Sequence, residues 1–314
     1  MINYRNFNLQ KISMLFFTLL IFTNLLGGGI FDPKGAIALA EKNLIITSVL
    51  LMLIVIIPVF ILTFYFAYKY RENNTKATYA PEWSHSTKLE FVWWGIPILI
   101  ILALGIITWK SSHDLDPYKP LPVNGKEPIV IQVVSLNWKW LFIYPNEQIA
   151  TLNYLNIPKD TPIAFLLTSD APMNSFWIPQ LSGQIYTMPG METKLHIIAN
   201  ENGKFEGMSA NYSGYGFSGM GFIVEASSTE DYNKWVSKVK SSSSEILDNN
   251  TYIKLAKFSL NDKIKTYSSV KPKLFYDILM KYMSPNKSEL LIDIMSESKK
   301  YNSMEHLEEI QKNK

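Results

Sequence analysis

Two short runs decide the fold, Ile129-Val130-Ile131-Gln132-Val133-Val134-Ser135 and Asn137-Trp138-Lys139-Trp140-Leu141-Phe142-Ile143. Both are rich in β-branched and aromatic residues, which favour packed strands. Similar runs follow at 163–168, 194–199 and 221–226, separated by turns rich in Gly, Pro, Asn and Asp. Short strands divided by such turns predict a β-sandwich of about a hundred residues, for which we set bounds of 117–228.

Upstream of the strands the chain is apolar over two long runs. A bilayer-spanning helix needs roughly 20 residues; the run 44–68 exceeds this length and the run 91–109 comes close to it. Aromatic residues stand at the ends of these runs, as is typical of membrane interfaces. The pattern therefore predicts a two-helix transmembrane hairpin over residues 40–112, followed by a Pro-rich linker.

The charges between the two runs predict the orientation of the hairpin. This loop carries four basic residues, Lys69, Arg71, Lys76 and Lys88. Basic loops stay on the cytoplasmic side of a membrane. We therefore expect the loop in the cytoplasm and everything after about residue 112 outside it.

The first 29 residues are similar to a secretory signal. Arg5 and Lys11 precede an apolar run at 12–26, which ends in Gly27-Gly28-Gly29. Gly29 stands where a bacterial lipoprotein signal would have its cysteine, so thioether lipidation is excluded. Two outcomes stay open, namely cleavage at another position or retention as an additional membrane helix.

Composition excludes several classes of site. The 314 residues carry a net charge of +3, too small and scattered to favour nucleic acid as a partner. The absence of cysteine excludes disulfides, thiolate metal sites and thiol nucleophiles. With four histidines in the chain, a multi-histidine metal site is not expected either.

Two segments lie between the predicted strands, Asn174-Ser175-Phe176-Trp177-Ile178-Pro179 and the Gly/Ser-rich loop from Ser209 to Met220. The loop has the spacing of the pattern C-x-E-x-C-G-x-x-x-H-x-x-M. Together with the hairpin, the sandwich and the Trp138-Lys139-Trp140 motif, these segments resemble subunit II of the haem–copper respiratory oxidases. The resemblance covers roughly residues 40–226 and implies a cupredoxin-like sandwich.

In copper-bearing members of that family, the loop holds a dinuclear copper centre through two thiolates, two imidazoles, a thioether and a carbonyl. The corresponding positions in this chain are Ser209 and Ser213, Asn174 and Phe217, Met220, and Asn211. Soft thiolates are what such a copper pair requires, and a serine hydroxyl or a phenyl ring does not replace them. We therefore expect no metal at this site and no cofactor bound by this chain.

Loss of the copper centre favours a lipid-soluble electron donor over cytochrome c. The matching segments are similar to the cytochrome o-type (bo-type) ubiquinol oxidase branch, which implies a metal-free subunit II of a proton-translocating oxidase. The same resemblance implies haems and one copper in a large subunit I, small membrane subunits and lipid as further partners, and a bacterial inner-membrane location with a periplasmic domain.

Glu90 opens the second apolar run within the pattern Glu90-x-x-Trp93-x-x-x-Pro97. A carboxylate at the start of a helix is also favoured by the helix dipole alone. The resemblance implies that Glu90 takes up protons for the large subunit, since a carboxylate at a membrane boundary can exchange protons with water.

Beyond residue 229 the pattern becomes helical and then strongly polar. Residues 231–239 place Tyr232, Trp235, Val236 and Val239 on one helical face. We expect a helical C-terminal arm and a polar tail over 229–314. Two other functions stay open, a cytochrome c oxidase subunit II that has lost its copper and a stand-alone membrane-anchored binding module.

Overall fold

The computed structural model describes residues 29–78, 80–121, 127–242 and 245–283. Residues 40–116 form one compact unit, and the described residues on either side of them form the other. The predicted signal-like segment, apart from Gly29, and the polar tail beyond about Ser288 lie outside the described residues.

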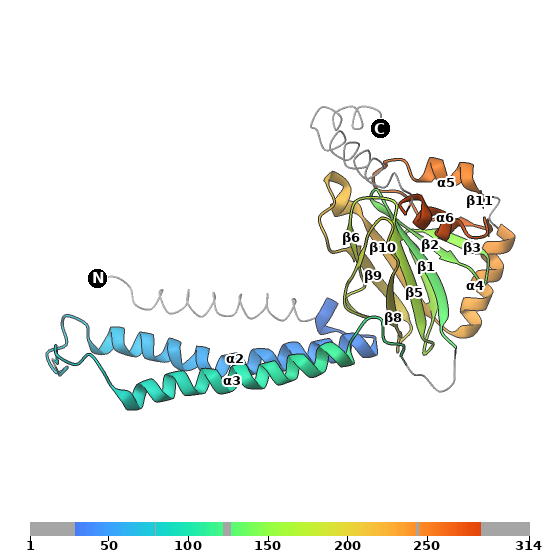
Figure 1. The fold of residues 1–314 in the computed structure, drawn as a ribbon. Helices are drawn as coiled ribbons and strands as arrows, with labels where there is room; N and C mark the ends of the chain where they lie inside the picture. Colours follow the sequence, from blue (N-terminus) through green and yellow to red (C-terminus); the bar gives the residue numbers. More distant parts are fainter. Residues whose placement is uncertain (1–28, 79, 122–126, 243–244, 284–314) are drawn as a thin grey trace, which may run out of the picture. The chain divides into compact units, whose positions relative to one another are not determined.

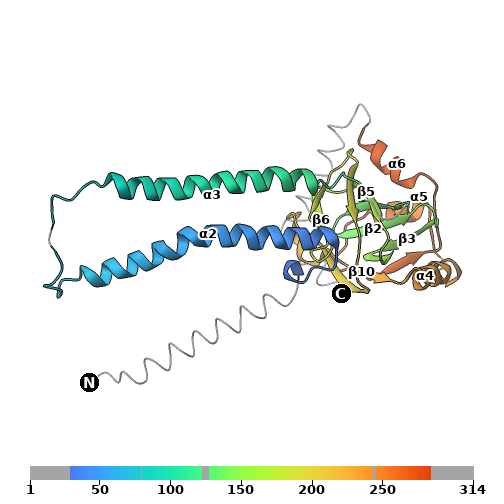
Figure 2. The same ribbon diagram turned by 90° about the horizontal axis from the view of Figure 1, so that it is seen from below.

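The first unit is an antiparallel helical hairpin (Figures 1 and 2). Helix α2 spans Ala36–Lys69 and helix α3 spans Thr87–Asp114, so both extend beyond the predicted apolar runs. Their most apolar windows have mean hydropathies of 3.1 and 2.3, and both helices are long enough to cross a membrane. Within α2, Thr47 and Thr63 donate hydrogen bonds to the carbonyl oxygens of Asn43 and Val59, which satisfies their hydroxyls inside an apolar helix.

The second unit is built on two sheets that face each other across a core. The larger sheet has the strand order β12-β3-β2-β1-β5-β8 and the smaller one β4-β10-β9-β6-β7. The strands are β1 (Ile129–Leu136), β2 (Lys139–Tyr144), β3 (Ile149–Leu152), β4 (Tyr154–Pro158), β5 (Ile163–Ser169), β6 (Asn174–Trp177), β7 (Ile185–Thr187), β8 (Thr193–Ile197), β9 (Gly203–Ser209), β10 (Gly221–Ser227) and β12 (Lys265–Tyr267). The β-sandwich prediction is thus confirmed.

The central strands of the larger sheet are buried on both faces, which explains their nearly continuous apolar sequence. Ile131 and Val133 of β1 enter the core between the sheets. The alternate residues Val134 and Leu136 enter a second core on the opposite face of the same sheet. A strand covered on one face only would alternate apolar with polar residues instead.

The C-terminal arm covers that second face (Figure 1). Helices α5 (Asn249–Leu255) and α6 (Leu274–Lys281) form this cover, with the short strands β11 (Ile246–Leu247) and β13 (Ser269–Val270), which pair with each other. The first helix of the arm, α4 (Thr229–Ser242), packs instead against the core between the sheets. The arm is more than helical, because β12 pairs with β3 and becomes the edge strand of the larger sheet. Apolar arm residues such as Leu255, Tyr267 and Phe275 pack in the second core.

Two local predictions were wrong. Asn137 and Trp138 form a two-residue turn between β1 and β2, so the second strand begins at Lys139. Trp138 has a φ of 71°, a backbone conformation that bulky residues rarely adopt. The segment that begins at Asn174 is also a strand, β6, rather than a connection between strands.

Candidate functional site

The first two positions that correspond to copper ligands, Asn174 and Ser209, lie on the neighbouring strands β6 and β9. β6 and β9 are antiparallel, with Phe176 opposite Ser209, so Asn174 lies close to the end of β9. The Ser209 hydroxyl lies 3.0 Å from Asn174 Oδ1 and 3.2 Å from the carbonyl oxygen of Asn211, either of which can accept its proton. Both Asn174 and Ser209 are buried. The sheet therefore brings together a predicted imidazole position and a predicted thiolate position.

Asn211 and Ser213 continue the loop after β9. The Asn211 side-chain amide donates to the carbonyl oxygen of Met173 at 3.0 Å, which ties the loop to the start of β6. Ser213 is buried, and its hydroxyl has no hydrogen-bond partner within the described residues. The Ser213 carbonyl oxygen, in contrast, accepts a hydrogen bond from Trp138 Nε1 at 3.1 Å. This part of the loop is thus held by the side chain of Asn211 and by the backbone carbonyl of Ser213.

Phe217 and Met220, near the end of the loop, differ in burial. Phe217 lies in a 3₁₀ helix, Tyr215–Gly219, and its half-buried ring contacts Tyr212 edge-on, with ring centroids 5.6 Å apart. Met220 is buried in the core between the sheets. A surface cleft of about 560 Å³ opens beside Ser209, Phe217 and Met220 and is bounded on its other side by Asp262, Lys263 and Ile264 of the arm.

Trp138 fills the space beneath the loop. A Cβ atom on Gly216 would lie only 2.3 Å from the Trp138 indole, so only glycine allows this close approach. Phe258 of the arm contacts the same indole, with ring centroids 5.7 Å apart. These contacts, together with the hydrogen bond to Ser213, hold Trp138 in its unusual backbone conformation.

The residues at the six positions do not fit a dinuclear copper centre. Ser209 has a hydroxyl in a hydrogen bond where a bridging thiolate is required, and Phe217 has no donor atom. Met220 retains a thioether, which is a weak ligand by itself. Within residues 29–78, 80–121, 127–242 and 245–283, no group of three or more His, Cys, Asp or Glu side chains could hold a metal ion.

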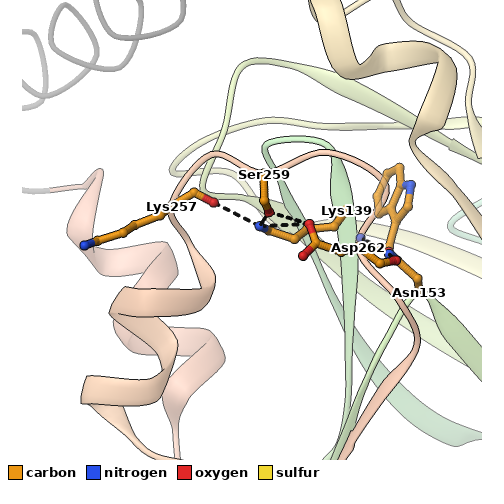
Figure 3. A network of polar contacts seen from close by, with 6 residues as sticks. Lys139, Asn153, Lys257, Ser259 and Asp262 are labelled. Atoms are coloured by element: carbon orange, nitrogen blue, oxygen red, sulfur yellow. Dashed lines mark hydrogen bonds and ion pairs between the residues drawn. The ribbon is translucent and has the colours of Figure 1, made fainter. Parts of the chain in front are cut away.

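A second polar cluster attaches the arm next to this site (Figure 3). The Lys139 ammonium is almost fully buried and donates to the carbonyl oxygen of Lys257 at 2.9 Å and to the hydroxyl of Ser259. Asp262 Oδ2 lies 3.3 Å from the same nitrogen and also accepts from Ser259. Burial lowers the pKa of Lys139, and the charge of Asp262 opposes that effect.

Asn153 extends this cluster to the backbone of the sheet. Its side-chain oxygen accepts from the backbone N–H of Trp140 at 2.8 Å, and its amide donates to the carbonyl oxygen of Asp262 at 2.9 Å. Asn153 has a φ of 54°, which asparagine tolerates better than most residues. The side chain therefore links the motif Trp138-Lys139-Trp140 to the arm (Figure 3).

Asp170 attaches the other end of the arm. This buried carboxylate follows β5 and accepts from the hydroxyls of Tyr252 and Tyr282 and from the Lys281 ammonium at 2.9 Å. Burial, and then the negative charge of Asp170, raise the pKa of both tyrosines. One carboxylate thus binds α5, α6 and the residue after α6 to the larger sheet.

Glu90 lies in the first turn of α3, in the unit formed by the helical hairpin. Its Oε1 is 2.6 Å from Nδ1 of His85, and the other ring nitrogen of His85 is 3.1 Å from the Thr87 hydroxyl. The Glu90 side chain is partly exposed, at 37%. The structure therefore gives Glu90 a titratable, water-accessible neighbour on the same side of the hairpin.

Sequence reasoning missed the clusters around Lys139 and Asp170. Their partners in the arm lie far away along the chain, so no local spacing reveals them. The available signals were weak: a lysine between two tryptophans, and an aspartate directly after a buried strand. A charged residue inside an otherwise apolar strand predicts a buried polar partner, because an unpaired buried charge is costly.

Known proteins match this chain over 82% of its length. The family model "Cytochrome C oxidase subunit II, periplasmic domain" matches residues 145–227, and "COX Aromatic Rich Motif" matches residues 241–286. Cytochrome bo(3) ubiquinol oxidase subunit 2 of Pseudomonas putida is 55% identical over 258 residues, which cover 82% of each chain.

Two further relatives agree. The protein of the same name from Pseudomonas aeruginosa is 55% identical over 82% of this chain and 78% of its own. Ubiquinol oxidase subunit 2 of Acetobacter aceti is 52% identical over 81% of this chain and 82% of its own. These matches confirm the resemblance inferred from the segments around Asn174 and Ser209. The chain therefore belongs to the family of cytochrome bo(3) ubiquinol oxidase subunit 2, within the haem–copper oxidase subunit II proteins.

Proposed function

We propose that this chain is the metal-free second subunit of a proton-translocating terminal oxidase, which oxidises ubiquinol and reduces dioxygen to water. Ubiquinol as the substrate of the complex is supported by the names of the relatives, which are ubiquinol oxidase subunits. The observation that carries the metal-free assignment is the hydrogen bond between Ser209 and Asn174, two positions that hold a thiolate and an imidazole in copper-bearing relatives. A hydroxyl donating to an amide leaves no strong ligand at either position.

In this proposal the redox centres, namely the haems and one copper ion, belong to the large subunit I. No residue of this chain is assigned to quinol chemistry. The chain contributes an assembly surface and a cap on the outer face of subunit I, alongside small membrane subunits and lipid. Cytochrome c is not a partner, because the site that would receive its electrons lacks metal ligands.

We assign the chain to the bacterial inner membrane, with the β-domain in the periplasm. The residues that flank the hairpin at both ends bind the β-domain, which supports this topology. Before α2, the N–H groups of Lys34 and Gly35 donate to the carbonyl oxygen of Gln180. After α3, the carbonyl oxygen of Pro117 accepts from the backbone N–H of His196. In this proposal both ends of the hairpin are periplasmic, and the loop with Arg71 is cytoplasmic.

Glu90, on the cytoplasmic side in this topology, takes up protons for the large subunit. Its contact with His85 and its partial exposure support this role, because both allow exchange with water. In the assembled complex, Glu90→Gln is expected to slow turnover while the haem content stays unchanged. Glu82→Gln, which removes an exposed carboxylate from the loop before α3, is the matched control. Unchanged turnover in Glu90→Gln would remove the role.

One experiment tests the central proposal. Membranes are solubilised, the complex is isolated through this chain, and haem, copper and oxygen consumption are measured together. We expect a large haem-bearing subunit, one copper ion per complex, and oxygen uptake driven by ubiquinol. Oxygen uptake driven only by reduced cytochrome c would favour a cytochrome c oxidase that has lost its copper site. Isolation of the chain alone would favour a stand-alone binding module.

A further inference from the structure

The end of α2 carries two cations that rest on tyrosine rings. Lys69 Nζ lies 5.4 Å from the ring centroids of both Tyr65 and Tyr70. The Arg71 guanidinium carbon lies 4.3 Å from the ring centroid of Tyr68. Cations in this arrangement are attracted by the negative face of the ring. The two basic side chains are therefore held at defined positions on an aromatic surface.

The positive charge of this cluster has no counterpart in the described part of the chain. No carboxylate there forms an ion pair with Lys69 or Arg71, although Glu72 follows Arg71 directly in the sequence. Other lysines with exposed side chains do pair, as Lys234 does with Glu230 at 2.7 Å. The end of α2 thus offers two unneutralised cations at one place.

The position of the cluster selects a lipid as its ligand. Lys69 is the last residue of α2, directly after an apolar helix with exposed side chains such as Phe60 and Leu62. Tyrosine rings and basic residues at the end of a membrane span lie at the depth of the lipid headgroups. A phospholipid bound here would have its phosphate at the cations and its acyl chains along the apolar surface of α2.

We propose that Lys69 and Arg71, held by Tyr65, Tyr68 and Tyr70, bind the headgroup of an anionic phospholipid in the cytoplasmic leaflet. This proposal rests on the membrane topology given under the proposed function. The guanidinium of Arg71 can bind two phosphate oxygens at once, and Lys69 adds a second charge. The rings restrict both side chains before the lipid arrives, which reduces the ordering cost of binding.

The test uses the intact, delipidated oxidase complex titrated with phosphatidylglycerol and, separately, with phosphatidylethanolamine, with bound lipid counted by native mass spectrometry. The variant Lys69→Gln/Arg71→Gln is compared with Lys76→Gln/Lys88→Gln, which removes the same charge from the loop after α2 and the first turn of α3. Because Lys69 and Arg71 contact the phosphate directly in this proposal, we expect phosphatidylglycerol to bind at least about tenfold more weakly to the first variant. The second variant removes charges that make no such contact, and solvent ions screen them, so binding is expected to change by less than about threefold.

Three results would overturn the site. Equal losses in both variants would mean that only the total charge of the loop matters, and no loss in either would mean that the cations do not bind lipid. Displacement of phosphatidylglycerol by millimolar inorganic phosphate would indicate a general anion site. As a further check, Tyr68→Phe is expected to retain binding and Tyr68→Leu to weaken it, because the ring face holds Arg71.

The topology is tested separately. The chain has no cysteine of its own, so Asn73→Cys introduces a single labelling site beside the cluster. A membrane-impermeant maleimide should label this position only after the cytoplasmic side has been opened. Labelling of intact cells would overturn the proposed orientation and with it the lipid site. Correct labelling combined with equal losses in the two charge variants would overturn the lipid site alone.

Discussion

Two kinds of polar cluster attach segments of the chain to the same sandwich, and they differ in charge. The loop from Ser209 to Met220 is joined to β6 by neutral amide and hydroxyl groups, those of Asn174, Ser209 and Asn211. The buried hydroxyl of Ser213 has no partner among the described residues. Asp170 and Lys139 attach the arm through buried charges, each of which binds three partners.

The difference indicates where the β-domain draws its stability. A neutral hydrogen bond contributes about 1 kcal/mol, whereas loss of one partner from a buried charged group costs about 3–5 kcal/mol. The loop from Ser209 to Met220 is therefore expected to tolerate substitution. Substitution of the buried charged residues that hold the arm is expected to destabilise the domain. Substitutions in both kinds of cluster test this contrast.

The largest expected effect is a gain of function at the neutral cluster. The variant Asn174→His/Ser209→Cys/Ser213→Cys/Phe217→His supplies two thiolates and two imidazoles beside Met220, and it should bind copper and turn purple. Copper analysis and visible absorption of the purified complex measure this gain. The same variant with Phe217 left unchanged is the control and should not show the purple absorption. A folded four-residue variant without copper would show that the loop does not retain the ligand geometry.

Asp170→Ala should cause the largest loss of stability. It leaves the hydroxyls of Tyr252 and Tyr282 without their acceptor and removes the ion pair of Lys281, so the free energy of unfolding should fall by about 2–5 kcal/mol. Urea unfolding of the detergent-solubilised chain, followed by tryptophan fluorescence, measures the change. Glu230→Ala removes a carboxylate that is 78% exposed and should have little effect. A loss below about 1 kcal/mol would contradict the contrast between the clusters.

Alkaline pH should weaken the attachment of the arm. The folded state raises the pKa of Tyr252 and Tyr282, and burial raises that of Tyr267 to about 12. Their contribution to stability is complete below the unfolded pKa of about 10 and is lost as pH rises through the folded values. Lys139, whose pKa is lowered, acts in the opposite direction above neutral pH. Urea midpoints between about pH 9 and pH 12 should fall, and less steeply in Tyr282→Phe.

Gly216→Ala should destabilise the loop through a steric clash. The new Cβ would lie 2.3 Å from the Trp138 indole, which is fixed by Ser213 and Phe258, so we expect a loss of about 1–3 kcal/mol. Gly221→Ala is the matched control, since the nearest atom to its Cβ would be 3.6 Å away. Hydrogen exchange of the complex should show faster exchange in residues 213–220 of the first variant only. Equal exchange in both would mean that Trp138 does not fix the loop.

The smallest effects concern the two serines at the thiolate positions. Ser209→Ala removes a hydrogen bond to buried Asn174 and should cost about 1 kcal/mol. Ser213→Ala removes a buried hydroxyl that has no partner among the described residues, so it should be neutral or slightly stabilising. The same urea experiment distinguishes them. Equal losses would indicate that the Ser213 hydroxyl has a partner in the assembled complex.

Sequence reasoning predicted the helices, the sandwich and the positions of the former ligands. The apolar runs in α2 and α3 and the β-branched runs in β1 and β5 are local patterns, and local patterns are what hydrophobic periodicity reports. The two errors at Trp138 and Asn174 have a different origin. Trp138 adopts a left-handed backbone because Ser213, Gly216 and Phe258 hold its ring, and β6 is a strand because β9 and β7 flank it.

Family membership and the order of the elements follow from the amino-acid sequence, which also predicts that Ser209, Ser213, Asn174 and Phe217 stand at copper-ligand positions. These properties depend on which residue stands at which position. Only the tertiary structure decided how the arm is attached, because Asp170 meets Tyr252 and Tyr282 across separations of 82 and 112 positions. Burial of those groups, and hence their altered pKa values, arises only when the arm closes over the larger sheet.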